Sequence, residues 1–190
     1  PALASLLPLL PLLPLLALLA VGNDANWDLR NYHLYGPHAL LNGRAAIDIA
    51  AARIQSFFNP LLDLPMYLLA RAGAHPKLIG LWLALPTIAS LWLLLRLQAR
   101  LSPSPPTPLA QVVLALLALT GGAVWSTFAL SMNDAFVGAA ILASLALVID
   151  AEGEPGWRRW LLAGLLAGAM AGLKLTAGVY CIGLAATTLV

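Results

Sequence analysis

The first residues that could do chemistry lie between positions 24 and 35, in the sequence DANWDLRNYHLY. In a helix, Asp28, Tyr32 and Tyr35 would share one face, because side chains three and four positions apart are neighbours. A carboxylate beside tyrosine hydroxyls can act as a general base, or it can position a cation or a hydroxyl group. Helix capping together with aromatic rings at a membrane interface is the structural alternative for the same pattern.

Metal-binding patterns are weak in this sequence. His33 and His38 are five positions apart, so they would not face each other on a helix. Cys181 is the only cysteine, which leaves neither a disulfide framework nor a cysteine metal site. We therefore predict no metal ligands and no cofactor; a divalent metal is compatible with the sequence but not indicated by it.

Two more polar groups interrupt apolar stretches. Asn133 and Asp134 stand at the start of one such stretch, where either could cap a helix and complement its dipole. Lys174 lies inside another. A lysine at the bilayer centre costs about 2.5–3.5 kcal/mol, so we expect Lys174 either to reach the interface or to meet an anion. The phosphate of a lipid-linked substrate is one such anion.

The elements that position these residues must lie in a membrane. Of 190 residues, 61% are apolar and 9% are charged, whereas soluble domains average about 45–50% and about 25%. This composition excludes a soluble enzyme and a disordered chain. The net charge is only +2, and no basic cluster exceeds Arg158-Arg159, so we predict no nucleic-acid partner.

We predict an all-α fold, a polytopic membrane helical bundle, because backbone polar groups in lipid are satisfied within helices. The predicted spans are 2–21, 78–95, 109–130, 135–149, 161–173 and 175–190, the last one partial. They would form one transmembrane domain, the N-terminal part of a longer protein. A cleaved signal peptide is the alternative for the first stretch, since Ala20-Val-Gly22 resembles a cleavage site.

Residues 23–76 form the predicted outer loop. They hold four of the eight acids and all three histidines, so we expect short amphipathic helices along the membrane surface. Asn59-Pro60 predicts a helix start, and Gly73 predicts the stop.

The arginines predict the orientation of the bundle. The loops after the second and fourth spans carry Arg96, Arg100, Arg158 and Arg159, which favours those loops as cytoplasmic. By alternation, residues 23–76, the Asn133-Asp134 turn and Lys174 fall on the outer face. We therefore expect Asp28, Asp134 and Lys174 to lie around one cavity there.

Several of these segments, in order, resemble glycosyltransferases of the GT-C superfamily, and the closest pattern is glycosyltransferase family 87. The resemblance is carried by Asp28-Leu-Arg-Asn-Tyr32, Ala39-Leu-Leu-Asn-Gly43, Phe57-Phe-Asn-Pro60, Asn133-Asp134, Ala163-Gly-Leu-Leu-Ala-Gly168 and Gly172-Leu-Lys-Leu-Thr176. Leu175 departs from the family pattern, which has proline after the lysine, and the tyrosine expected before the loop proline is absent.

The resemblance implies an inverting transferase with a polyprenyl-phosphate sugar as donor and a glycan, lipid or protein as acceptor. Asp28 would then be the base for the acceptor hydroxyl, while Lys174, with Arg30 or Arg44, would neutralise the leaving phosphate. Tyr32, Asn133 and Asp134 would complete the substrate site. The expected location is the bacterial inner membrane, with the active face outward and membrane lipids as neighbours.

Two other classes stay open from the sequence. A lipid flippase or transporter would place polar groups near the bilayer midplane, on broken helices. The polar residues here gather at one interface instead, which favours the enzyme. An inactive membrane scaffold is the third interpretation.

Overall fold

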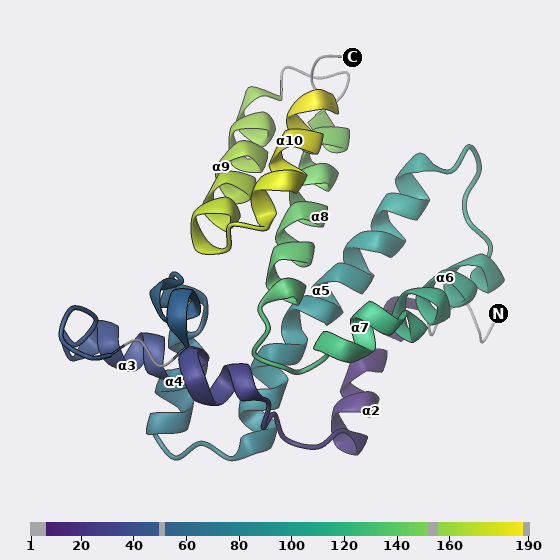
Figure 1. Ribbon diagram of the computed structural model, residues 1–190. Coiled ribbons are helices and arrows are strands. Elements are labelled where there is room, and N and C mark those ends of the chain that lie inside the picture. The colour runs from purple at the N-terminus through teal and green to yellow at the C-terminus, as the bar shows by residue number, and fades with distance from the viewer. Residues whose placement is uncertain (1–6, 50–51, 152–155, 188–190) are drawn as a thin grey trace.

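The structure is a computed structural model that describes residues 7–49, 52–151 and 156–187. Within those ranges every regular element is a helix, which confirms the predicted all-α fold (Figure 1). The α-helices are α2 (Leu13–Ala20), α3 (Tyr35–Leu41), α4 (Leu64–Arg71), α5 (Pro76–Leu101), α6 (Pro108–Thr120), α7 (Gly122–Thr127), α8 (Asp134–Ala151), α9 (Trp157–Leu173) and α10 (Ala177–Thr187). Shorter turns of other helix types are η1 (Leu7–Leu12), η2 (Leu29–His33), η3 (Arg53–Phe57) and η4 (Pro60–Leu62).

Two helices, α5 and α8, are long and apolar enough to cross a membrane, judged by length and composition. At 1.5 Å per residue they measure about 39 Å and about 27 Å. They pack against each other through Leu93 and Leu97 of α5 and Ala146 of α8. Parts of the predicted spans 2–21 and 175–190 lie outside the described residues, and the described parts of the remaining predicted spans coincide with shorter helices. The stretch 109–130 is two helices, α6 and α7, because Gly121 adopts an extended backbone between them.

The helices form two groups on either side of α5. Figure 1 shows α8, α9 and α10 as a bundle at the top, while α2, α6 and α7 lie to the right of α5. On that second side, Leu18 of α2 packs with Ala84 of α5 and with Phe128 and Ala129 after α7. Gly80 permits the close approach of α2, since a Cβ there would lie 3.0 Å from Leu18 Cδ1.

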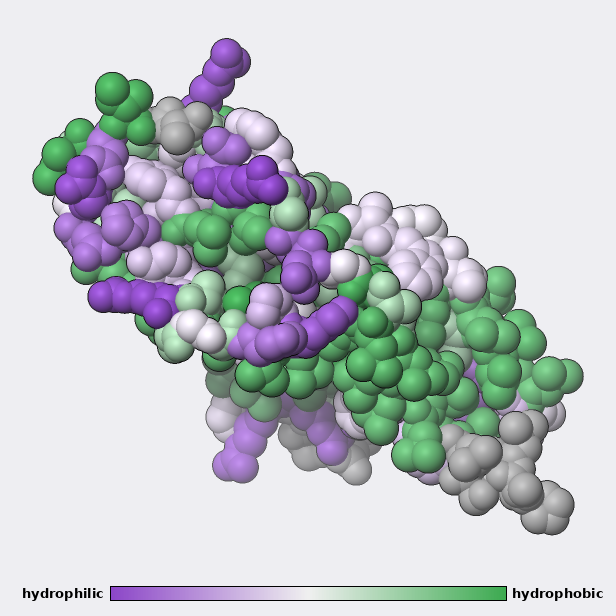
Figure 2. All heavy atoms as spheres, turned by 90° about the horizontal axis from the view of Figure 1, so that it is seen from below, coloured by the Kyte–Doolittle hydropathy of each residue, from purple (hydrophilic) through white to green (hydrophobic). Residues whose placement is uncertain are grey.

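The outer surfaces of these helices are strongly apolar. Large side chains that point outward include Leu12, Leu16 and Leu19 at the N-terminal end and Leu109, Leu116 and Leu117 on α6. In Figure 2 hydrophobic side chains cover one half of the lower face and hydrophilic ones gather on the other half. Such a division is typical of a protein that faces lipid on some helices and water at one end.

The segment 23–76 is folded as short helices at the lower left of Figure 1. Asn59 Oδ1 accepts a hydrogen bond of 3.1 Å from the Leu61 amide, and Pro60 occupies the first position of η4. Gly73 follows α4 with a φ of 73°, a conformation that suits glycine. The predicted start and stop signals in this segment are therefore confirmed.

Candidate functional site

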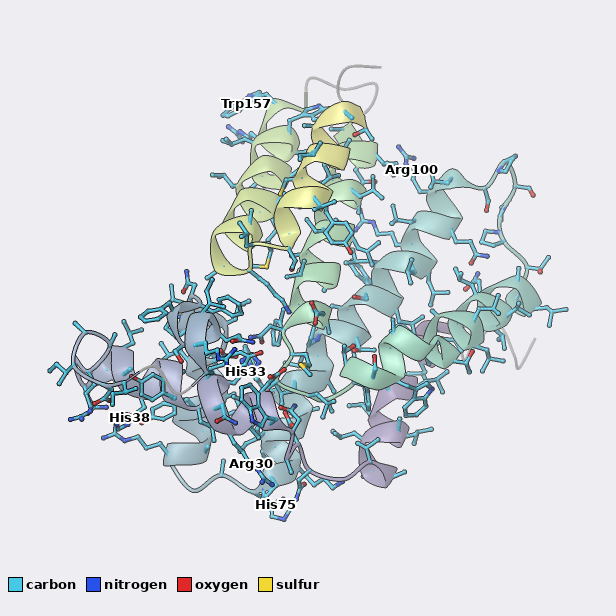
Figure 3. The ribbon with its side chains drawn as sticks, viewed as in Figure 1. Arg30, His33, His38, His75, Arg100 and Trp157 are labelled. Carbon is cyan, nitrogen blue, oxygen red and sulfur yellow. The ribbon has the colours of Figure 1, made fainter. Side chains whose placement is uncertain are left out.

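The two ends of α8 carry different ionic groups. At its first residue, Asp134 Oδ1 lies 2.6 Å from Lys174 Nζ. At its other end, Asp150 pairs with Arg96 and lies 3.9 Å from Arg100. Figure 3 shows Arg100 and Trp157 at the upper end of the molecule and His33 at the lower end. Lys174 is thus at the opposite end of the bundle from the arginines.

Lys174 meets an anion of the chain itself. The helix α9 ends at Leu173, and Lys174 continues with an extended backbone, from which its Nζ also donates to the Met132 carbonyl. The exposed fractions of the paired side chains are 26% for Lys174 and 53% for Asp134. Because a pair that reaches solvent contributes only about 0–1 kcal/mol, another anion can compete with Asp134 for the lysine.

Asp28 and Tyr32 form the second part of this cluster. The Tyr32 hydroxyl is hydrogen-bonded to the Asp28 carboxylate. Burial raises the pKa of the Tyr32 phenol above its ordinary value, and the charge of Asp28 raises it further, with smaller contributions from Asp63 and Asp134. The raised pKa keeps the Tyr32 phenol protonated, so it can donate to Asp28.

The turn that carries this pair is a π-helix. The Leu34 amide donates to the Leu29 carbonyl at 3.0 Å, a bond that spans five residues instead of four. The wider turn rotates the following residues, and Tyr35 is hydrogen-bonded to Asp48. The expectation that Tyr35 shares a face with Asp28 assumed a regular α-helix, whereas the segment between them is a π-turn. Turns of this kind occur often at functional sites.

A buried carboxylate, Asp63, organises the site, and the sequence analysis missed it. Asp63 is 5% exposed, and its Oδ1 accepts hydrogen bonds from His33 Nδ1 at 2.9 Å and from Asn133 Nδ2 at 2.6 Å. The three residues come from η2, from the start of α4 and from the turn before α8. An acid within the apolar run LLDLP was the available signal, because a buried charge needs partners.

Asn133 does not cap α8 with its side chain, as one interpretation of the sequence had it. Its backbone is left-handed, with a φ of 62°, and its amide group is bonded to Asp63. Asparagine tolerates this conformation better than most residues. The turn before α8 is thereby fixed to the 23–76 segment.

Other contacts fix the same segment to the bundle. Asp24 Oδ2 accepts a hydrogen bond of 2.8 Å from the Ser131 amide. Asn59 Nδ2 donates to the Gly172 carbonyl at 3.1 Å, two residues before Lys174. The ring of Phe58 lies edge-on to Tyr32, with 5.9 Å between ring centroids. These contacts bring the Asp28–Tyr32 pair and Lys174 to the same end of the molecule.

The two arginines proposed as phosphate ligands are both exposed. Arg44 is exposed and pairs with Asp48, four residues on, with its Nε 2.8 Å from Asp48 Oδ2. Arg30 is exposed as well. Figure 3 shows it below His33, near the bottom of the view, where His75 also lies. The contact between Arg44 and Asp48 does not include Asp134 or Lys174.

A cavity of about 210 Å³ lies next to this cluster. Its lining is mostly apolar and includes Asp24, Leu29 and Lys77, but neither Asp28 nor Lys174. Asp28, Asp134 and Lys174 lie at one end of the bundle, as expected. The cavity lies beside these residues and is not lined by Asp28 or Lys174. In the described residues, no three His, Cys, Asp or Glu side chains gather within reach of one metal ion.

An apolar helical bundle with a carboxylate, a phenol and a lysine at one end is typical of a membrane-associated protein. The profile of glycosyltransferase family 87 matches residues 57–188, well over half of the chain. The chain therefore belongs to glycosyltransferase family 87, as its sequence resemblance indicated. No curated protein and no solved structure matches it. The matched range includes Asp63, Asn133, Asp134 and Lys174 and begins after Asp28 and Tyr32.

Proposed function

We propose that this protein transfers a sugar from a polyprenyl-phosphate donor to an acceptor hydroxyl at the outer face of the membrane. The observation that carries the proposal is that Asp63 bonds both His33, next to Tyr32, and Asn133, next to the Asp134–Lys174 pair. A base and a cation that can neutralise phosphate are thus available at one end of an apolar bundle.

Asp28 removes the proton of the acceptor hydroxyl as the oxygen attacks the anomeric carbon. The new C–O bond forms as the bond from the anomeric carbon to the phosphate oxygen breaks, with inversion, and the polyprenyl phosphate leaves with the electron pair. One carboxylate suffices, because phosphate is a good leaving group, whereas glycoside hydrolysis requires two. Tyr32 holds the Asp28 carboxylate in place through its hydrogen bond.

Lys174 stabilises the charge that develops on the leaving phosphate. To do so its ammonium group exchanges part of its contact with Asp134 for the phosphate, and the exposure of that pair permits the exchange. The apolar surfaces of the neighbouring helices suit the prenyl chain. Asn133 completes the substrate side of the site, and Asp134 holds the lysine until the phosphate binds.

A transporter without chemistry is the alternative class. It would be favoured by polar groups near the middle of long helices, yet Asp134 and Lys174 stand at helix ends here. An inactive scaffold is the remaining alternative, and an assay separates all three.

The test uses the intact protein in proteoliposomes that contain a radiolabelled polyprenyl-phosphate sugar and a mixture of lipid and glycan acceptors. We expect label to appear in an acceptor, and we expect no transfer from a nucleotide sugar. Movement of the labelled lipid between leaflets without transfer would support the transporter. Neither transfer nor movement would support the scaffold, and either result would contradict the proposed function.

A further inference from the structure

Two polar atoms in the Asp63 network are buried and have no hydrogen-bond partner. They are His33 Nε2 and Asn133 Oδ1, on side chains from residues that are 5% and 7% exposed. Buried polar atoms are nearly always satisfied in folded proteins, so each of these two requires an explanation. Both residues are bonded to the same atom, Asp63 Oδ1, which makes them neighbours.

The chemistry of the two atoms follows from their bonds to Asp63. An ionised carboxylate only accepts, so His33 Nδ1 and Asn133 Nδ2 must both be the donors. In a neutral imidazole the proton on Nδ1 leaves Nε2 as an acceptor, and the Asn133 oxygen is an acceptor as well. With Asp63 ionised and His33 neutral, these neighbouring residues thus offer two acceptors, and a ligand that satisfies both must supply two donors.

We propose that His33 Nε2 and Asn133 Oδ1 form a sugar subsite that accepts hydrogen bonds from two neighbouring hydroxyl groups of the donor sugar. This inference rests on the proposed function, because it assigns the part of the same site that holds the sugar ring. The ring centroids of Tyr32 and His33 are 4.2 Å apart. Tyr32 is in turn hydrogen-bonded to Asp28, the proposed base. The subsite is therefore adjacent to the reacting groups.

Entry of the sugar requires a small opening, since both acceptor atoms are covered in this structure. The turn between α7 and α8 carries Asn133, and it has a left-handed backbone at Ala129 (φ 55°) and at Asn133 (φ 62°). The proposal therefore includes a displacement of this turn on donor binding, which would uncover both acceptor atoms.

Two substitutions of His33 separate the proposed subsite from a purely structural role. In His33→Asn the amide stands on Cγ, where Nδ1 stands, so the bond to Asp63 can persist while the Nε2 acceptor is lost. In His33→Gln the amide lies further out and restores an acceptor near the position of Nε2. We expect KM for the donor to rise about tenfold in His33→Asn, with less change in kcat. In His33→Gln we expect a smaller rise in KM.

A second measurement uses the wild-type protein and monodeoxy analogues of the donor sugar that it transfers. We expect two adjacent deoxy positions to raise KM about tenfold each in the wild type. In His33→Asn, one of those two deoxy positions should no longer raise KM, because the acceptor of that hydroxyl is already missing. In Asn133→Gly, which keeps the left-handed backbone, the other deoxy position should no longer raise KM.

The matched control is Gln98→Leu, which removes another buried unpartnered oxygen at the far end of α5. We expect its KM to equal that of the wild type. If His33→Asn lowers the melting temperature but leaves KM and the deoxy pattern unchanged, a water molecule or simple packing occupies the site, and the subsite is overturned. Wild-type protein that transfers no sugar at all would instead overturn the proposed function, so the two failures are distinguishable.

Discussion

Lys174 Nζ lies 2.6 Å from Asp134 Oδ1, although α8 and α9 separate the two residues in the sequence. The contact closes the end of the helical pair next to the 23–76 segment. It also leaves the lysine neutralised by a carboxylate that is more than half exposed. A phosphate that approaches Lys174 therefore competes with Asp134, and the two residues should respond to substitution in opposite ways.

Lys174→Met should raise KM for a polyprenyl-phosphate donor by about tenfold or more, because the charge that meets the phosphate is lost. Asp134→Asn should not raise it, since the ammonium group is then freed from its competitor. The measurement is initial transfer rate against donor concentration in proteoliposomes, normalised to the amount of inserted protein. Equal increases in KM for both variants would mean that the ion pair only holds α8 and α9 together.

The network around Asp63 should dominate the stability of the 23–76 segment. Asp63→Leu leaves the donors of His33 and Asn133 buried without an acceptor, at a cost of about 1–3 kcal/mol for each. The expected result is a clear fall in the melting temperature of the detergent-solubilised protein. Asp48→Leu is the matched control: its carboxylate pairs with the exposed Arg44, so the change should be small. A similar fall in both variants would contradict the central place of Asp63.

Tyr32 should make the folded protein sensitive to alkali. Burial and the nearby carboxylates raise the pKa of its phenol above the ordinary 10.0, so the unfolded chain loses this proton at a lower pH than the folded protein does. The stability linked to Tyr32 is thus fully present below about pH 10 and is lost as pH rises toward the folded pKa. Melting temperatures of wild type and Tyr32→Phe between pH 8 and pH 11 test this.

The Tyr32→Phe variant should lose less stability over that pH interval than the wild type does. Absorbance at the tyrosinate band offers an independent check, because three tyrosines remain in the variant. The late-titrating fraction should disappear with the substitution. Parallel pH curves for the two proteins would contradict the protonated, buried state of Tyr32.

The helices were predictable because their signals are local. The apolar stretches, the Asn59 cap and the Gly73 stop depend on neighbouring residues, and the structure has them where the sequence placed them. The placement of Asp134 and Lys174 at one end followed from counting spans. The break at Gly121 was missed, since glycine is tolerated in many membrane helices and the hydropathy pattern continues across it.

The details of the site depend on contacts between distant residues, which a single sequence does not display. The bonds of Asp63 to His33 and Asn133 join three segments, so nothing near Asp63 predicts them. The π-turn that separates Tyr35 from Asp28 changes the spacing by one residue, a change that periodicity does not detect. The family resemblance offered Arg44 as a phosphate ligand, and it did not predict the pairing of Arg44 with Asp48.

The role of Asp24 differs from that of Asp28 in a way that supplies a control. Asp24 accepts from the Ser131 amide and from Asn26, so its work is to fasten the segment to the turn before α8. Asp24→Asn retains one oxygen acceptor and should reduce transfer only slightly, with a lower melting temperature as the main effect. Comparable loss of transfer in Asp24→Asn and Asp28→Asn would point to a jointly held loop and not to a single base.

The measurement that tests the account most directly is sugar transfer by Asp28→Asn. Asparagine keeps the shape of the side chain and can still bond Tyr32, but it cannot take the proton of the acceptor. The intact protein and the variant are assayed in proteoliposomes with a radiolabelled polyprenyl-phosphate sugar, at equal expression and equal melting temperature. We predict a loss of about 10²–10⁴-fold in kcat, the usual contribution of a general base. Full activity in the Asp28→Asn variant would contradict the account.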